Sequence, residues 1–469
     1  MGIRRRVRVT IAAATAVCAI AACAPGGGGN VNSSDADGWS QNFSGTKLVV
    51  LAEATANSAI LTEHLGDFTK KTGIDVQIEQ APVDSLTQKA VLDFTTKRGS
   101  YDVISFPQDY LGSYAEKGYI EPIDDWVTKP PAETGTGFDT KDILPALWKA
   151  SSQWKGKYYG VPSNSAVMLL VYRKDLLENP AEKDAFKAKY GYDLGPAKTW
   201  AQYRDIAEFF TRPEGAQAAG QPLSRALYGV TLAGKRHSAT VYEWMNYAWG
   251  FGGDIFDAAG MPAVNSEGNV KALEYAQSLS KFAPPGFTSA TWDEITATLQ
   301  QGQAAQSITW ADTAGALENP DDSTVAGKMG YASMPSLDGA KPGAADLGAW
   351  NFGINSSGKN KEAAYLFTAW ALSQGTQKLI GEGGGLPSLT STFQDPALVA
   401  KFPYWTQAMT SLEELRTRPR IPEAPAITDA LALALSQVLS GGQNAKAGLD
   451  GAQQQVQTIM NGHLPVTDQ

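Results

Sequence analysis

The sequence predicts an α/β fold, and the order of its apolar patterns between residues 47 and 106 carries that prediction. Three short runs of strand character alternate with two stretches whose apolar residues recur at helical spacing. A strand–helix–strand–helix–strand order is typical of a largely parallel sheet with helices packed on its faces. In such sheets ligands bind beyond the carboxyl ends of the strands, which here are residues 53–58 and 107–110.

Each element of this first part has its own signal. Thr72-Gly73 ends the first helical pattern, and Asp84 stands where the cap of the second helix is expected. We therefore expect strands at 47–52, 74–78 and 101–106, and helices at 58–71 and 84–97.

The remaining chain continues to mix strand and helix patterns. Apolar strands are expected at 167–172, 306–311 and 350–354, and a chain crossing between domains at 328–335. Helices are expected from Trp200 onward, over 242–251 and over 360–372, and the chain from about residue 390 to the end is mainly helical.

Size and composition indicate an ordinary folded protein with more than one core. The chain has 469 residues, 43% hydrophobic and 19% charged, with a formal net charge of −9. An acidic balance without clustered Lys and Arg argues against nucleic acid as a partner.

The first residues have the layout of an export signal. A basic segment with Arg4, Arg5, Arg6 and Arg8 precedes the short apolar stretch 9–22. The ending Ile20-Ala21-Ala22-Cys23 resembles the lipobox of bacterial lipoproteins, and this resemblance implies that Cys23 carries a lipid. The alternative is a plain secretory signal with a chance cysteine. In the lipoprotein interpretation, residues 1–22 are the signal peptide that is removed, and residues 23–45, rich in Gly, Ser and Asn, form a lipid-anchored flexible tether.

Cysteine and histidine usage limits metal and disulfide chemistry. Cys18 and Cys23 are the only cysteines, so the processed chain has no partner for a disulfide. His64, His237 and His463 lie far apart and form no zinc-binding motif, and we expect neither a metal site nor a cofactor.

Four motifs occur in an order that resembles one known family. They are Gly160–Ser163 followed by a strand and Arg173-Lys-Asp175, Ser307–Trp310, Gly348–Asn355 with the helix after it, and Gly383–Ser388. From about Thr46 to the end, the chain resembles the family 1 extracellular solute-binding proteins of ABC importers, the group that includes maltose-binding proteins.

The resemblance implies a two-lobed periplasmic-binding-protein-like fold of class II, with a ligand cleft between lobes joined by several hinge crossings. One lobe is expected at 46–161 plus 331–385 and the other at 162–330 plus 386–469. It also implies a monomer that closes on its ligand, has no catalytic residues, and docks on a membrane permease.

Carbohydrate ligands present hydroxyl groups and apolar faces, so their sites combine polar side chains with aromatic planes. Residues of these types near the expected strand ends and turns are Glu53, Asn57, Gln108, Asp109, Asn164, Trp249, Trp310, Asp312, Trp350 and Asn351. By resemblance, Trp310 stacks on the ligand and Asn164 offers a polar contact. Gly384 and Leu386 match a loop that closes over the ligand, and Arg418 and Arg420 lie where relatives offer an arginine.

Each of these residues also has a structural interpretation. The tryptophans can belong to the core, Asp109 can cap a helix, Glu53 can pair across strands, and the two arginines can brace a Pro-rich surface segment. Which of Arg418 and Arg420 faces the cleft stays open at this point.

One motif is similar to a nucleotide-binding loop but lacks a residue that such a loop needs. Gly353–Asn360 is nearly a phosphate-binding loop, but Asn360 replaces the Ser or Thr that would hold Mg²⁺. We expect Ser356 and Asn360 to be turn and helix-cap groups instead.

The sequence thus predicts the substrate-binding component of an ABC importer for a small mono- or oligosaccharide. The alternatives are the same fold with a polyol, glycerophosphodiester, peptide or metal as ligand, and, less favoured, a secreted glycoside hydrolase with two opposed carboxylates.

Overall fold

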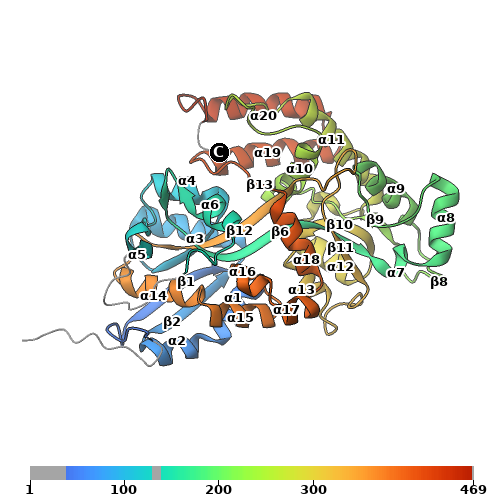
Figure 1. The fold of residues 1–469 in the computed structure, drawn as a ribbon. Coiled ribbons are helices and arrows are strands. Elements are labelled where there is room, and N and C mark those ends of the chain that lie inside the picture. Colours follow the sequence, from blue (N-terminus) through green and yellow to red (C-terminus); the bar gives the residue numbers. More distant parts are fainter. Residues whose placement is uncertain (1–37, 129–138, 467–469) are drawn as a thin grey trace, which may run out of the picture.

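The computed structural model describes residues 38–128 and 139–466. These residues are organised around a nine-stranded sheet with the order β2-β1-β3-β12-β6-β10-β9, in which β11 adds to β6 and β13 adds to β12 (Figure 1). Its strands are β1 Lys47–Glu53, β2 Asp75–Ala81, β3 Val103–Pro107, β6 Val161–Arg173, β9 Tyr228–Val230, β10 Ala304–Trp310, β11 Met329–Ala332, β12 Ala345–Ile354 and β13 Leu415–Arg416. The mixed α/β class predicted from the sequence is confirmed.

The first part of the sheet follows the predicted order closely. β1 pairs in parallel with both β2 and β3, and helices connect these strands. These helices are α1 Ala56–Glu63, α2 Leu65–Thr72 and α3 Val83–Thr96. Gly73 ends α2 in the left-handed conformation with φ 72°, which glycine adopts without strain.

Two predictions in this region are wrong. The single helix expected over 58–71 is two helices that meet at His64, whose backbone leaves the helical region. Asp84 does not cap α3, because the cap position is Pro82 and Asp84 lies in the first turn of the helix. There its side chain faces the neighbouring cleft.

β6 is the strand that connects the two ends of the sheet. It has 13 residues, about twice the length predicted over 167–172. Its first half pairs with β12, while its second half pairs with β10 and β11. β12 is also long and pairs with β3 through its second half. The sheet therefore has a first part around β1–β3 and a second part around β9–β11, joined by continuous strands.

Helices cover both parts of the sheet and connect its edges. The first part carries α4 Leu111–Glu116, α5 Asp124–Thr128, α6 Pro145–Ser152, α14 Lys361–Ala371 and α15 Gln374–Glu382, with the hairpin β4 Gln153–Trp154 and β5 Lys157–Tyr158. Along the second part lie α7 Lys174–Leu177, α8 Pro180–Tyr190, α9 Trp200–Phe210, α12 Trp292–Gln300 and α13 Thr313–Leu317, with the hairpin β7 Gln217–Ala218 and β8 Gln221–Pro222.

The chain from about residue 390 onward is mainly helical, as predicted, and part of it returns to the second part of the sheet. Its helices are α16 Thr390–Phe393, α17 Pro396–Lys401, α18 Tyr404–Glu413, α19 Ala424–Leu439 and α20 Ala445–Ile459. α19 and α20 pack with α10 Ser238–Gly250 and α11 Glu267–Leu279 in one helical layer, at the top of Figure 1.

The segment that resembles a phosphate-binding loop has ordinary structural contacts. Ser356 donates its hydroxyl hydrogen to the Gly118 carbonyl, in keeping with the predicted turn role. The cap role predicted for the Asn360 side chain is wrong, because its amide binds Asp102 and makes no cap hydrogen bond to α14.

The described residues contain no helix that is both long and apolar enough to cross a bilayer. The leader, the lipidation site Cys23 and most of the tether fall outside the described residues.

Candidate functional site

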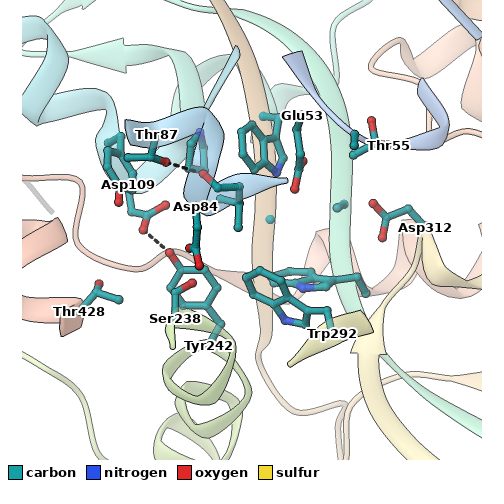
Figure 2. A pocket seen from close by; sticks show the side chains of 18 of the residues that line it. Glu53, Thr55, Asp84, Thr87, Asp109, Ser238, Tyr242, Trp292, Asp312 and Thr428 are labelled. Atoms are coloured by element: carbon teal, nitrogen blue, oxygen red, sulfur yellow. Dashed lines mark hydrogen bonds between the residues drawn. The ribbon is translucent and has the colours of Figure 1, made fainter. Parts of the chain in front are cut away.

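A cleft of about 810 Å³ lies where the two parts of the sheet face each other (Figure 2). On one side it is lined by the ends of β1 and β3 and by α3, and on the other by α10, α12 and the end of β10. Trp350 and Gly348 of β12 lie between them. The position matches the general rule that ligands bind beyond the carboxyl ends of parallel strands.

Aromatic rings form one wall of this cleft. The rings of Trp292 and Trp310 have centroids 6.3 Å apart at an interplanar angle of 63°. Tyr242 lies 5.9 Å from Trp292 and nearly parallel to it. Gly348 makes room for Trp310, because a Cβ atom at Gly348 would lie 2.5 Å from the Trp310 ring. Such apolar planes suit the C–H faces of a polyhydroxylated molecule.

Two carboxylates, Glu53 at the end of β1 and Asp312 after β10, project into the cleft above Trp292 (Figure 2). Burial raises the pKa of Glu53 well above its ordinary value, and the negative charges of Asp312 and Asp293 raise it further. Burial also raises the pKa of Asp312, while the amide of Asn164, 3.3 Å away, acts against this shift. Both groups are hydrogen-bond acceptors for ligand hydroxyls.

Arg418 is the one lysine or arginine among the described residues that line the cleft, and its charge is already engaged. Its guanidinium forms ion pairs with Asp346 and, at 3.4 Å, with Asp109. It also lies 3.5 Å over the Tyr242 ring, whose hydroxyl donates a 2.5 Å hydrogen bond to Asp109. Burial alone would lower the pKa of Arg418, but the two carboxylates raise it, so the group stays charged.

Comparison with known proteins places this arrangement in one family. The family model "Bacterial extracellular solute-binding protein" matches residues 52–378. This chain belongs to that family.

A solved ABC transporter solute-binding protein from Agrobacterium radiobacter K84, in complex with ribitol, is 30% identical to this one. The two structures match over 89% of this chain and 99% of the Agrobacterium chain, with a TM-score of 0.77. A mannitol-binding protein of Pseudomonas aeruginosa is 25% identical over 87% of this chain and 92% of its own length. A probable amino-acid ABC transporter periplasmic-binding protein of Sinorhizobium fredii is 28% identical over 82% of both chains. The protein is therefore a solute-binding component of an ABC importer with the two-lobed α/β fold, acting outside the cytoplasm.

The cleft of this solute-binding protein brings together six of the residues proposed from the sequence. They are Glu53, Asp109, Trp310, Asp312, Trp350 and Arg418. Asn57 and Asn164 lie next to it, around a small cavity of about 10 Å³ that also touches Glu53 and Trp350. Asn57 uses its side chain to bind the Ser163 carbonyl and both backbone groups of Leu386.

Two predicted residues lie beside cleft residues but have structural contacts of their own. Gln108 donates to the Leu347 carbonyl, and Asn351 binds Ser151 and Ser152 of α6. The position of Asn351 follows from the strand, because consecutive residues point to opposite faces and Trp350 takes the cleft face.

The other predicted residues lie away from the cleft. Trp249 lies under the guanidinium of Arg416, and the Gly384 carbonyl accepts from Tyr404. Leu386 is buried, and Arg420 binds three backbone carbonyls around α6. The open choice between the two arginines is thereby decided, since Arg418 reaches the cleft and Arg420 does not.

The cleft residues that sequence reasoning missed include Tyr242, Trp292, Ser238 and Thr428. Trp292 had a usable signal, because it is the first residue of α12, directly after Thr291, which forms a capping box with Glu294. A large aromatic in the first turn of a helix is often only partly covered. Tyr242 had no such sequence signal, because it lies in an aromatic-rich helix in which most residues are buried in the core.

Within the described residues no group of three or more His, Cys, Asp and Glu side chains is arranged to hold a metal ion.

Proposed function

We propose that this solute-binding protein captures a small uncharged polyhydroxylated solute, a sugar or a polyol, in the cleft and delivers it to a membrane permease. The observation that carries the proposal is the pairing of aromatic planes with the acceptors Glu53 and Asp312 around one hollow. Hydroxyl hydrogens satisfy carboxylate acceptors, while the rings cover the apolar faces of the ligand.

Charge argues against an anionic solute such as a glycerophosphodiester. Its phosphate would need a basic group, and Arg418 is held by Asp346 and Asp109. Releasing Arg418 would leave two buried carboxylates unpaired, which costs several kcal/mol. The same shortage counts against an amino acid, because its carboxylate would find no unpaired lysine or arginine among the described residues that line the cleft.

The similar proteins support a polyhydroxylated ligand. One was solved with ribitol and another is named for mannitol, both linear polyols. We therefore rank a polyol beside a sugar, higher than the sequence alone suggested.

Three further points belong to the same proposal. The lobes comprise 46–161 plus 331–385 and 162–330 plus 386–469, and they close on the ligand as a monomer. Cys23 anchors the protein by a lipid to the outer face of the cytoplasmic membrane, supported by the Ile-Ala-Ala-Cys ending of the leader. The protein binds without catalysis, supported by relatives that are named as binding proteins.

Thermal unfolding of the purified protein against ribitol, D-mannitol, other polyols, mono- and disaccharides, glycerophosphodiesters and amino acids tests the proposal. A ligand that binds only the folded state stabilises it by about 2.7 kcal/mol at a hundredfold excess over its Kd. We expect a rise in Tm with a polyol or sugar, and chemical analysis of the recovered compound should find it unchanged.

Trp310→Ala provides the link to the cleft. It should weaken binding of the active compound by at least roughly tenfold, because it removes a stacking plane. Trp126→Ala, an aromatic on α5 that packs on Tyr365 away from the cleft, is the matched control and should keep wild-type affinity. A response only to glycerophosphodiesters or amino acids would contradict the assignment, and conversion of the compound would contradict binding without catalysis.

A further inference from the structure

A contact between His237 and Asp84 spans the mouth of the cleft. Asp84 lies on α3 of the first part, and His237 is the cap residue of α10 in the second part. The Nε2 atom of His237 lies 3.2 Å from an oxygen of Asp84, and their neighbours Ser238 and Thr87 line the cleft. The contact thus joins the two sides of the cleft directly.

The ring of His237 is fixed by two further contacts. Its Nδ1 accepts a hydrogen bond from the Ala239 amide, which places the proton of the neutral ring on Nε2, facing Asp84. The ring also packs edge-on against Trp292, with centroids 5.2 Å apart. His237 therefore connects three elements: the start of α10, the aromatic wall, and α3.

The same helix makes similar contacts further from the mouth. Tyr242 donates to Asp109 at the end of β3, and Asn246 accepts from the backbone amide of Asp346 on β12. Tyr242 and Asn246 are four residues apart and so lie on one face of α10, and His237 caps the N-terminal end of the same helix. Through these three residues α10 contacts α3 at the mouth of the cleft, the end of β3 further in, and β12 at its inner end.

These contacts differ sharply in strength. The side chains of Asp109, Asp346 and Arg418 are 0–4% exposed and form a shared network, so separating them would leave buried charges without partners, which is strongly unfavourable. The side chain of Asp84 is 65% exposed, and such exposed pairs contribute little to stability. Opening at the mouth is therefore far less costly than separation at the inner end.

We propose that His237 and Asp84 form a latch across the mouth of the cleft, and that the cleft opens by breaking this latch while the inner end of α10 stays bound. His237 acts as a positioning residue, because it holds the mouth closed and braces Trp292 at the same time. The latch biases the ligand-free protein toward the closed arrangement.

Distance measurements between nitroxide labels at the mouth test the latch without a ligand, and so independently of the proposed solute. Leu92→Cys on α3 and Lys235→Cys before α10 give two exposed label positions, with Cys18 and Cys23 replaced by Ser. His237→Asn removes the reach to Asp84 but keeps a good helix cap. Asp84→Ala removes the other partner, and the double variant completes the cycle.

Each single variant should raise the ratio of the population at long label distance to the population at short label distance by roughly two- to fivefold. The double variant should raise this ratio by the same factor as each single variant. Arg236→Gln is the control, because it breaks an exposed ion pair with Asp429 that stays within the second part. Identical distance distributions in all variants would overturn the proposal. An equal change of the distance ratio in Arg236→Gln would also overturn it. The same holds if the double variant changes the ratio by the product of the two single-variant changes, because His237 and Asp84 would then act independently.

Discussion

Glu243 is a buried acid whose titration should make the protein less stable as pH rises. It lies on α10, 4% exposed, and accepts hydrogen bonds from the Ala233 amide at 2.8 Å and the Tyr247 hydroxyl at 2.9 Å. Burial raises the pKa of Glu243 from 4.5 to about 7, and the two hydrogen bonds offset only part of this shift. No arginine or lysine is among the causes of this shift.

The sign follows from proton linkage. Between pH 4.5 and about 7 the folded protein keeps the Glu243 proton while the unfolded chain has released it. Folding stability therefore falls as pH rises through this range. Each pKa unit corresponds to about 1.4 kcal/mol, so the full effect is on the order of 3 kcal/mol.

Glu243→Gln should remove this dependence, because an amide keeps an acceptor for Ala233 and stays neutral at every pH. Measured by urea unfolding, the stability of the variant relative to wild type should increase by on the order of 3 kcal/mol from pH 4.5 to pH 8. Comparing the two proteins at each pH cancels the titration of all other groups.

Glu182→Gln is a control of opposite sign. Glu182 is also buried, but Arg212 and the Ala219 amide overcome the effect of burial and lower its pKa. Its contribution is present above the ordinary pKa of glutamate and is lost as pH falls, so this variant should lose most stability near neutral pH. Parallel pH curves for wild type and Glu243→Gln would refute the reasoning.

Three substitutions test the framework of the cleft. Arg418→Met should destabilise the protein by about 3–5 kcal/mol in chemical denaturation, because it strands two buried carboxylates, and a loss below about 1 kcal/mol would contradict the network. Asn57→Ala should cost about 1–3 kcal/mol in the same assay, since the Ser163 carbonyl and the backbone of Leu386 lose their partner; an unchanged midpoint would show that water replaces it. Gly348→Ala should displace the Trp310 ring, weaken binding of the active solute by roughly tenfold or more and shift tryptophan fluorescence, whereas wild-type affinity would show that the ring tolerates the added methyl.

Local patterns were enough to predict most elements and the region of the site. The strand β1, the end of α2 at Gly73 and the helix α14 followed from residue spacing and from conformational preferences that act over a few residues. The cleft residues Glu53 and Asp312 were also accessible, because side chains just after a strand lie at the ligand-binding edge of an α/β sheet.

Other features depended on contacts between distant segments. Arg418 and Arg420 stand two residues apart in a similar Pro-rich context, yet one forms a buried network with Asp346 and Asp109 and the other binds carbonyls around α6. Nothing local distinguishes them, since the partners lie far away in the chain.

The sequence by itself determined the α/β class, the order of its elements and the edge of the sheet at which the cleft lies, because these depend on periodicity and local backbone preference. The tertiary structure alone decided which side chains face the cleft, which acids are paired, and how α10 meets the first part at His237 and Tyr242. Those outcomes depend on which distant surfaces pack together, and burial and charge pairing are properties of that packing.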